Sequence, residues 1–203
     1  MKPTPSKNDA DFESIVDGSI IQIKPQSFSA AIRRGSSVKF TAMVEPAKNF
    51  PLDLYFVMDH SHSMKPTLDT LKNSVDAMSE KLKNLTNNHR IGFGTFVDKT
   101  TAPYIYTTEA RKKNPCQTRT DGSGDGGTSC PPAYNFNNTV SLDEFEQFST
   151  LIEVSEVSAS VDLPEAGMDA LMQVAACKDP IGWRDHSRKV IVYLTDTGLS
   201  IFA

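Results

Sequence analysis

The chain has 203 residues, 38% of them hydrophobic, which is enough for one full domain and part of a second. Its formal net charge of −4 argues against a nucleic-acid partner held by bulk electrostatics. No apolar run approaches the ~20 residues that cross a bilayer, and residues 1–9 hold no apolar core of a signal peptide. Composition alone therefore predicts neither nucleic-acid binding nor a membrane anchor within these residues.

The N-terminal quarter is predicted to contain no complete domain. Residues 1–18 are polar and contain prolines, and we expect them to be a disordered leader. Residues 19–51 hold short runs of roughly alternating polarity with a turn at Gly35, a pattern typical of short antiparallel strands. Such strands are too few for an independent sheet, so we expect this segment to need a partner domain.

The pattern changes at Leu52, where strands begin to alternate with helices. Continuous apolar runs at 54–58 and 190–194 are typical of buried parallel strands. Between them we expect, in chain order, a helix from Pro66 to about Asn84, a strand at 91–97, an extended segment at 101–108, a helix capped by Ser141 and Glu144, and a helix opened by Pro164 and Glu165.

This alternation predicts an α/β domain with a mostly parallel, doubly wound sheet over residues 52–203. The last predicted strand is followed by only a few residues in this sequence. One more strand and helix would normally cover the edge of such a sheet. We therefore expect the domain to be incomplete at its C-terminal side.

Oxygen-bearing side chains stand where the predicted strands end. Asp59, Ser61 and Ser63 form a D-x-S-x-S turn after the first strand, Asp98 follows the second, and Asp196 follows the last. Open α/β sheets bind ligands at the carboxyl ends of their strands, and such oxygens suit Mg²⁺, Mn²⁺ or Ca²⁺. The loop from Ser160 to Glu165 adds further acidic residues at a helix entrance.

This pattern predicts a metal-dependent binder, in which an outside carboxylate completes the coordination shell. The alternative for the D-x-S-x-S turn alone is a helix-capping turn, in which the hydroxyls bond to backbone N–H groups. We expect His60 and His62 to be exposed or to lie just outside the metal shell, because a site of hard oxygen ligands has no need of imidazole.

Cysteines and sequons favour an extracellular protein. Cys116 and Cys130 flank a Gly/Ser/Asp-rich loop, and a disulfide there could contribute about 3 kcal/mol in the entropic account, whereas zinc binding lacks a CxxC or His pair. Cys177 is left over, either as a buried thiol or with a partner outside this chain. Two N-glycosylation sequons begin at Asn84 and Asn137.

Two enzyme classes are alternatives to a binding protein. Asp59 could be the nucleophile of a Mg²⁺-dependent phosphotransferase, or the first strand could belong to a dinucleotide-binding oxidoreductase. No phosphate-cradling glycine loop follows Met58, and no general acid stands two residues after Asp59. Both observations favour a protein that is not an enzyme.

Four segments resemble the motifs of a known family. Residues 53–59 (DLYFVMD), 90–100 (RIGFGTFVDKT), 162–170 (DLPEAGMDA) and 181–184 (IGWR) resemble DLYYLMD, RIGFGSFVDK, DSPEGGFDA and IGWR of integrin β subunits. The motifs are long and specific, and the resemblance covers about residues 19–200.

The resemblance implies a β-I domain of the von Willebrand factor A type at 52–203, inserted in a β-sandwich hybrid domain whose first segment is 19–51. It implies a cell-adhesion receptor of the plasma membrane with this part on the extracellular face. With an integrin α subunit, such a receptor binds an acidic residue of a matrix or cell-surface protein, often the Asp of an RGD sequence, and takes part in integrin-mediated signalling.

The matching positions imply two metal sites and one disulfide. The ligand-binding Mg²⁺ (or Mn²⁺) would be held by Asp59, Ser61, Ser63, Glu165 and Asp196. The neighbouring Ca²⁺ would be held by Asp98, Ser160, Asp162, Pro164 and Glu165, several through backbone carbonyls. Cys116 and Cys130 would close the specificity-determining loop.

Several positions depart from the family pattern. Pro66 and Thr67 stand where most members carry two Asp, which removes the negative ligands of a regulatory Ca²⁺ site. Ser160 replaces an Asn, and His60 and His62 replace an apolar and an aromatic residue. A further interpretation is a truncated, non-signalling integrin-like product.

Overall fold

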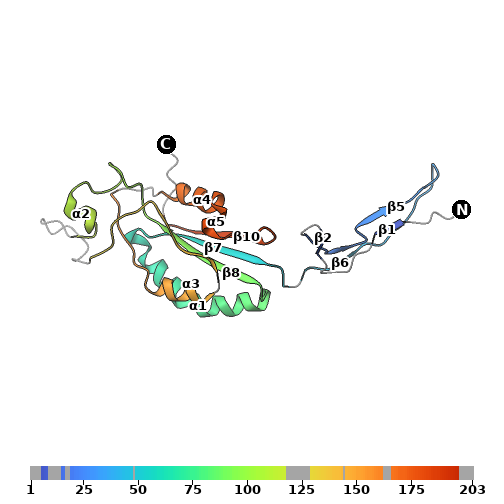
Figure 1. The fold of residues 1–203 in the computed structure, drawn as a ribbon, viewed down its shortest axis with the longest axis horizontal. Coiled ribbons are helices and arrows are strands. Elements are labelled where there is room, and N and C mark those ends of the chain that lie inside the picture. Colours follow the sequence, from blue (N-terminus) through green and yellow to red (C-terminus); the bar gives the residue numbers. More distant parts are fainter. Residues whose placement is uncertain are drawn as a thin grey trace. The chain divides into compact units, whose positions relative to one another are not determined.

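The computed structural model describes residues 6–8, 15–16, 19–47, 49–117, 129–143, 145–161 and 166–196. The chain divides into two compact units, Met1–Phe50 and Pro51–Ala203, which are taken separately below (Figure 1). In the described residues, no helix is long and apolar enough to cross a membrane.

The first unit consists of short antiparallel pairs. The pairs are β1 (Ser6–Asn8) with β5 (Ser27–Ser29), β2 (Ile15–Val16) with β3 (Ser19–Ile20), and β4 (Ile23–Lys24) with β6 (Met43–Val44). The expected turn is present, because Gly35 has a φ of +80° and the Ser36 N–H donates to the Arg33 carbonyl at 3.0 Å.

The first unit has strands within the expected leader and exposes apolar side chains. Within the expected leader, β1 and β2 are short strands, while the other residues of 1–18 lie outside the described part. Phe40 and Val44 are 59% and 72% exposed although both are apolar. Pairs this short bury little apolar surface by themselves.

The second unit is built on a four-stranded sheet in the order β10–β7–β8–β9. The central strand β7 (Leu52–Asp59) is parallel to β8 (His89–Phe96) and to β10 (Arg188–Leu194), as the apolar runs predict. β9 (Phe136–Asp143) is antiparallel to β8 and forms an edge. The sheet is thus mostly parallel, and the carboxyl ends of three strands share one border.

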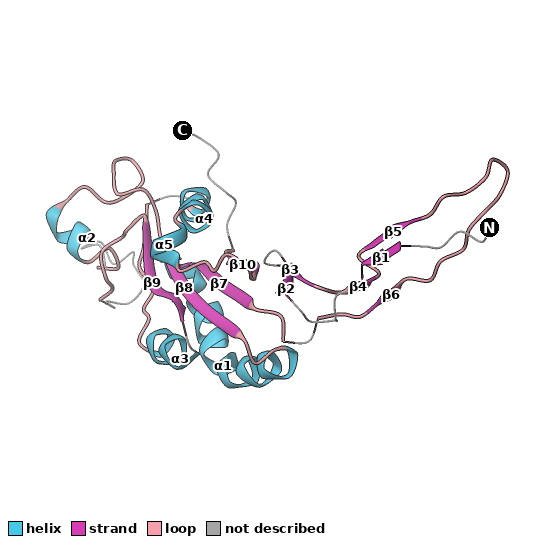
Figure 2. Ribbon diagram, turned by 45° about the vertical axis from the view of Figure 1, so that its right-hand side comes forward, coloured by secondary structure: helices cyan, strands magenta, loops and turns pink. Residues whose placement is uncertain are grey.

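Helices cover both faces of this sheet (Figure 2). One face packs against α1 (Lys65–Leu85) and α3 (Phe145–Glu153), with Phe93 in that core. The other face packs against α4 (Gly167–Ala176) and α5 (Lys178–Ile181), with Phe96 in that core. Both phenylalanines are fully buried, so one apolar core lies on each face of the sheet. This arrangement agrees with the predicted von Willebrand factor A type of fold.

The local structure differs from the sequence-based expectations at 101–108 and at Ser141, and one predicted helix is described only in part. The segment 101–108 is not extended, because turns hold it: the Tyr104 N–H donates to the Thr101 carbonyl at 3.0 Å. Ser141 lies inside β9, so its predicted role as a helix cap is wrong; its hydroxyl donates to the Pro180 carbonyl at 2.7 Å. The helix predicted to open at Pro164 is described only from Gly167.

The amino end of β7 is held by a buried ion pair. Asp53 is fully buried and accepts from the Arg184 side chain at 2.7 Å and from the Ser187 hydroxyl at 2.5 Å. Arg184 also donates to the Asn88 side chain and to the Leu52 carbonyl. This clamp ties the loop before β10 to the loop before β8.

Candidate metal centre

The site begins where β7 ends, at Asp59. The Asp59 carboxylate is fully buried and accepts from the Ser61 backbone N–H at 2.7 Å and from the Thr195 hydroxyl at 2.9 Å. These two donors come from the carboxyl ends of neighbouring parallel strands. They fix the orientation of the carboxylate before any ligand is present.

Two serine hydroxyls continue outward from Asp59. The Ser61 and Ser63 hydroxyls are 3.2 Å apart, and the Ser63 hydroxyl donates to the Asp196 carboxylate at 3.2 Å. Ser61 is buried, whereas Ser63 and Asp196 are exposed. The predicted residues of β7 and β10 therefore meet in one hydrogen-bonded chain that runs from the interior to the surface.

The helix-capping alternative does not describe these serines. A short 3₁₀ turn, His62–Met64, follows Ser61, and α1 follows Met64. Neither the Ser61 side chain nor that of Met64 caps a backbone N–H. The hydroxyl oxygens of Ser61 and Ser63 are thus directed at each other and at Asp196, not at the start of the helix.

The electrostatics of this cluster favour a cation. Burial raises the pKa of Asp59, and the nearby Asp196 carboxylate adds to that rise, against the hydrogen bonds from Ser61 and Thr195. No Lys or Arg of the described chain makes a salt bridge to Asp59. Oxygen atoms of this kind are ligands that Mg²⁺ and Mn²⁺ prefer, so the donor set fits such an ion.

The predicted Ca²⁺ ligands are only partly described. Asp98 is 1% exposed and accepts from the Lys99 N–H at 2.7 Å, and Ser160 is half-buried. Asp162, Pro164 and Glu165 lie outside the described residues, so Glu165 cannot be placed for either metal. In the described part of the chain, no three His, Cys, Asp or Glu side chains form a metal-binding group.

The described residues on either side of 162–165 each donate a backbone hydrogen bond to the segment that follows β8. The Val161 N–H donates to the Tyr104 carbonyl at 3.0 Å. The Ala166 N–H donates to the Val97 carbonyl at 3.4 Å, directly beside Asp98. Ala166 therefore lies at the carboxyl end of β8, and Val161 lies beside the turn segment 101–108.

The sequence did not single out Thr195, Thr95 or Tyr134 as residues of the site, and of the two places expected for His60, the exposed one is wrong. Thr195 contacts Asp59 directly, but a threonine after a strand carries no distinguishing signal. His60 is 2% exposed, its Nδ1 lies 3.2 Å from the Tyr134 hydroxyl, and that hydroxyl lies 2.7 Å from the Thr95 hydroxyl. Burial lowers the pKa of His60 to about 4, so the imidazole is neutral behind the site. His62 is half-buried.

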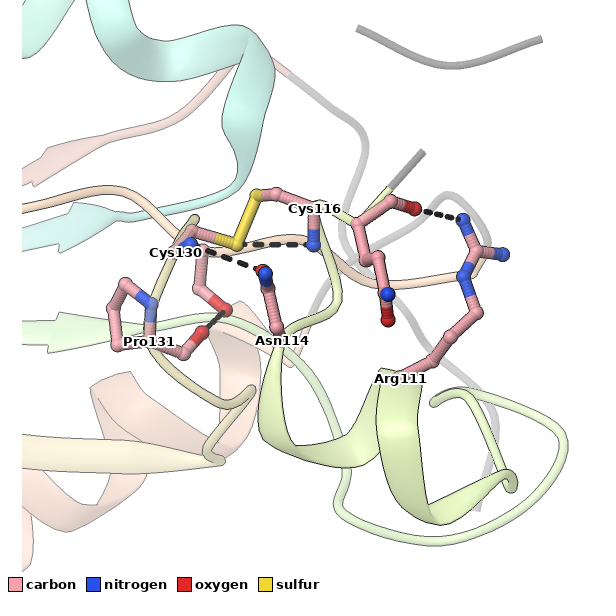
Figure 3. Close-up of a disulfide and its surroundings, with 7 residues drawn as sticks. Arg111, Asn114, Cys116, Cys130 and Pro131 are labelled. Carbon is pink, nitrogen blue, oxygen red and sulfur yellow. Dashed lines mark hydrogen bonds between the residues drawn. A yellow bond between two sulfur atoms is a disulfide. The ribbon is translucent and has the colours of Figure 1, made fainter. Parts of the chain in front are cut away.

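A disulfide joins Cys116 and Cys130, with a Cα–Cα distance of 5.6 Å (Figure 3). The Cys130 N–H donates to the Asn114 side chain at 3.1 Å. The Ser158 hydroxyl donates to the Pro131 carbonyl at 2.7 Å. The disulfide thus fixes the two ends of the loop, residues 117–129, beside the strand-end region. Cys177 is an exposed free thiol, not a buried one.

Comparison with known proteins identifies the family. The profile of the integrin beta chain VWA domain matches residues 47–203. The chain is 38% identical to integrin beta-1 of Gallus gallus over 187 residues, 37% identical to integrin beta-6 of Sus scrofa over 179 residues, and 36% identical to integrin beta-PS of Drosophila melanogaster over 188 residues.

These matches cover 88–92% of this chain and 21–22% of the relatives. The chain therefore spans about one fifth of the length of the proteins it resembles. The match includes β7 with its terminal aspartate, β8 and β10, which are the strands that bring the oxygen cluster together. On these grounds the chain belongs to the integrin β family.

Proposed function

We propose that the second unit is an adhesion module that binds an acidic side chain of an extracellular protein through Mg²⁺ or Mn²⁺. The observation that carries the proposal is the chain of oxygens from Asp59 through Ser61 and Ser63 to Asp196. Glu165 is proposed as a further ligand from the family motif. A bound Mg²⁺ would offer an open coordination position to the carboxylate of the partner.

Each residue of the site has a defined part in this proposal. Asp59 supplies a buried negative charge, held in place by the Ser61 N–H and by the positioning residue Thr195. Ser61 and Ser63 supply neutral oxygens, so this shell repels an incoming acid less than a shell with carboxylates in their place would. Ser63 and Asp196 are exposed, so the guest carboxylate approaches from their side.

A second, Ca²⁺-binding site is proposed at the end of β8. Asp98 and Ser160, together with Asp162, Pro164 and Glu165, supply oxygen ligands suited to Ca²⁺. The backbone hydrogen bond from Ala166 to Val97 supports it, because it holds one flank of the loop beside Asp98.

A regulatory Ca²⁺ site at the start of α1 does not fit this chain. The first turn of α1 contains no acidic residue, and Pro66 and Thr67 offer no carboxylate. The next acid along the helix, Asp69, lies beyond that first turn and forms an exposed ion pair with Lys65 at 3.7 Å.

The assembly and location of the protein are proposed from the family. We infer that this chain acts with an integrin α subunit, at the extracellular face of the plasma membrane, and not as an enzyme. The disulfide between Cys116 and Cys130 agrees with an oxidising compartment.

The test is calorimetric titration of the full chain with Mg²⁺ and Mn²⁺, beside Asp59→Ala and Glu165→Ala. Binding by the wild type and its loss in both variants is expected. The chain paired with an α subunit should then capture an RGD peptide, but not the matched RGE peptide, in Mn²⁺ and not in EDTA. Absence of metal uptake by the folded wild type would refute the proposal.

A further inference from the structure

The edge strand β9 carries a sequon in a specific arrangement. Asn137 and Thr139 are two residues apart on this strand, so their side chains share one face. Asn137 is exposed, and its side-chain amide donates to the Thr139 hydroxyl at 3.3 Å. In the described part of the chain β9 pairs only with β8, which leaves its outer border without a strand partner.

A cavity of about 280 Å³ lies beside these two residues. Leu151 of α3 and Val154, the residue after α3, supply apolar lining, and Ser155 and Glu156 supply polar lining. Val154 is 69% exposed although it is apolar. A sugar ring matches this lining, because a pyranose has an apolar face and hydroxyl groups around its rim.

We propose that Asn137 carries an N-linked glycan whose first sugar lies in this cavity and covers Val154 and the border of β9. The donor is a lipid-linked oligosaccharide pyrophosphate. The Asn137 Nδ2–C1 bond forms as the bond between C1 and the phosphate oxygen breaks; the lipid pyrophosphate leaves, and the amide loses one proton. Exposed strand borders invite pairing with other chains, and a bulky glycan prevents that pairing.

The second sequon, at Asn84, is proposed to have a structural role instead. Its Thr86 ends α1, is 5% exposed, and accepts from the Asn88 N–H through its hydroxyl at 3.1 Å. Helix contacts are local and form quickly, whereas β9 pairs with a strand about 40 residues away and forms later. The transferase therefore has longer access to Thr139 than to Thr86.

Occupancy is tested by expressing the full chain, with a secretion signal added, in a eukaryotic host, and by translating it in the presence of microsomes. Glycopeptide mass spectrometry should find the glycan on Asn137. Asn137→Gln and Thr139→Ala should abolish it, and the matched variant Asn84→Gln should keep it. The microsome assay reads transfer even where a variant fails to be secreted. An unmodified Asn137, or a glycan lost in Asn84→Gln, overturns the proposal.

The position of the first sugar in the cavity is tested by shortening the glycan enzymatically. An endoglycosidase that leaves one N-acetylglucosamine should give a melting temperature about 2–4 °C above that of the fully deglycosylated chain. This difference should vanish in Val154→Ser and persist in Met172→Ser, which removes an equally exposed apolar side chain from α4. Equal melting temperatures of the wild-type chain with one N-acetylglucosamine and without any sugar would refute binding of the first sugar in the cavity. Mn²⁺ uptake should be the same in Asn137→Gln and wild type, so this result is independent of the metal proposal.

Discussion

The two ends of strand β7 each bury an aspartate, and the two carboxylates are in opposite situations. Asp53, at the amino end, meets the Arg184 guanidinium and the Ser187 hydroxyl. Asp59, at the carboxyl end, meets an N–H, a hydroxyl and the negative charge of Asp196. Both are fully buried.

Their pKa values move in opposite directions for that reason. Burial alone would raise the pKa of Asp53, but the hydrogen bonds from Ser187 and Arg184 and the positive charge of Arg184 outweigh it and lower the pKa. Burial and Asp196 raise the pKa of Asp59. Asp53 has a structural role, because the described chain supplies Arg184 as its cation. The described chain supplies no cation to Asp59, so this acid is suited to bind a cation from solution.

Removing the charge of Asp53 should have the largest effect on stability. Asp53→Asn leaves the Arg184 guanidinium, which is 22% exposed, without its counter-ion. The free energy of unfolding should fall by about 3 kcal/mol, as for other broken buried pairs, in urea titrations with or without Mg²⁺. Asp185→Asn, in the exposed pair with Lys178, is the control and should leave the midpoint unchanged. Equal midpoints for the two variants would contradict the structural role of Asp53.

The contribution of Asp53 should also depend on pH. Its folded pKa lies below the ordinary value of 3.8, so the stabilisation is fully present above pH 3.8 and is lost as pH falls through the lowered pKa. The difference in unfolding free energy between wild type and Asp53→Asn should therefore be constant from pH 7 to about pH 5 and shrink below 3.8. A difference that shrinks instead above pH 5 would point to another group.

Changing Asp59 should have little effect without metal and a clear effect with it. In EDTA, Asp59→Asn should be at least as stable as the wild type, because it removes a buried negative charge beside Asp196. The Thr195 hydroxyl, which donates to Asp59, can accept a hydrogen bond from the new amide instead. At Mg²⁺ one hundred times its Kd, the wild type alone should gain about 2.7 kcal/mol. Thermal melting of both proteins with and without Mg²⁺ measures this gain in stability. A variant that gains as much as the wild type would exclude Asp59 as a ligand.

The sequence predicted the parts of the fold whose signals are strong. β7 and β10 are continuous apolar runs, and α1 keeps its 3,4 spacing through Leu68, Val75 and Leu82, all three buried. β9 was missed because it is an edge strand: Asn137 to Thr139 are polar, and its register shifts against β8. Leu142, which lies in β9, fits the apolar spacing of the helix that contains Phe148, and this placed the predicted helix start at Ser141, too early in the chain.

The site was predictable to the extent that strand ends determine it. Asp59 and Asp196 follow neighbouring parallel strands, so topology alone brings them to one border. The burial of His60 was not predictable, because it depends on backbone contacts from two distant segments. Its N–H donates to the Phe96 carbonyl and its carbonyl accepts from the Ser158 N–H, both at 2.7 Å.

The smallest expected effect concerns the start of α1, where, unlike at Asp59, the first turn supplies no carboxylate. Pro66→Asp with Thr67→Asp adds two carboxylates to an exposed first turn. Calorimetry should then count one more Ca²⁺ per chain than in the wild type, with a rise in melting temperature of only a few degrees, because exposed Ca²⁺ sites bind weakly.

The uncharged pair Pro66→Asn with Thr67→Asn separates Ca²⁺ binding from other effects of the change. Acids in a first turn also stabilise the helix dipole, by about 0.3–1 kcal/mol, so the Asp pair alone is more stable even in EDTA. Only a gain that needs Ca²⁺ and is absent from the Asn pair reports a new site. If the wild type already bound this additional Ca²⁺, backbone and hydroxyl oxygens would suffice there, and a missing carboxylate could not be equated with a missing ion.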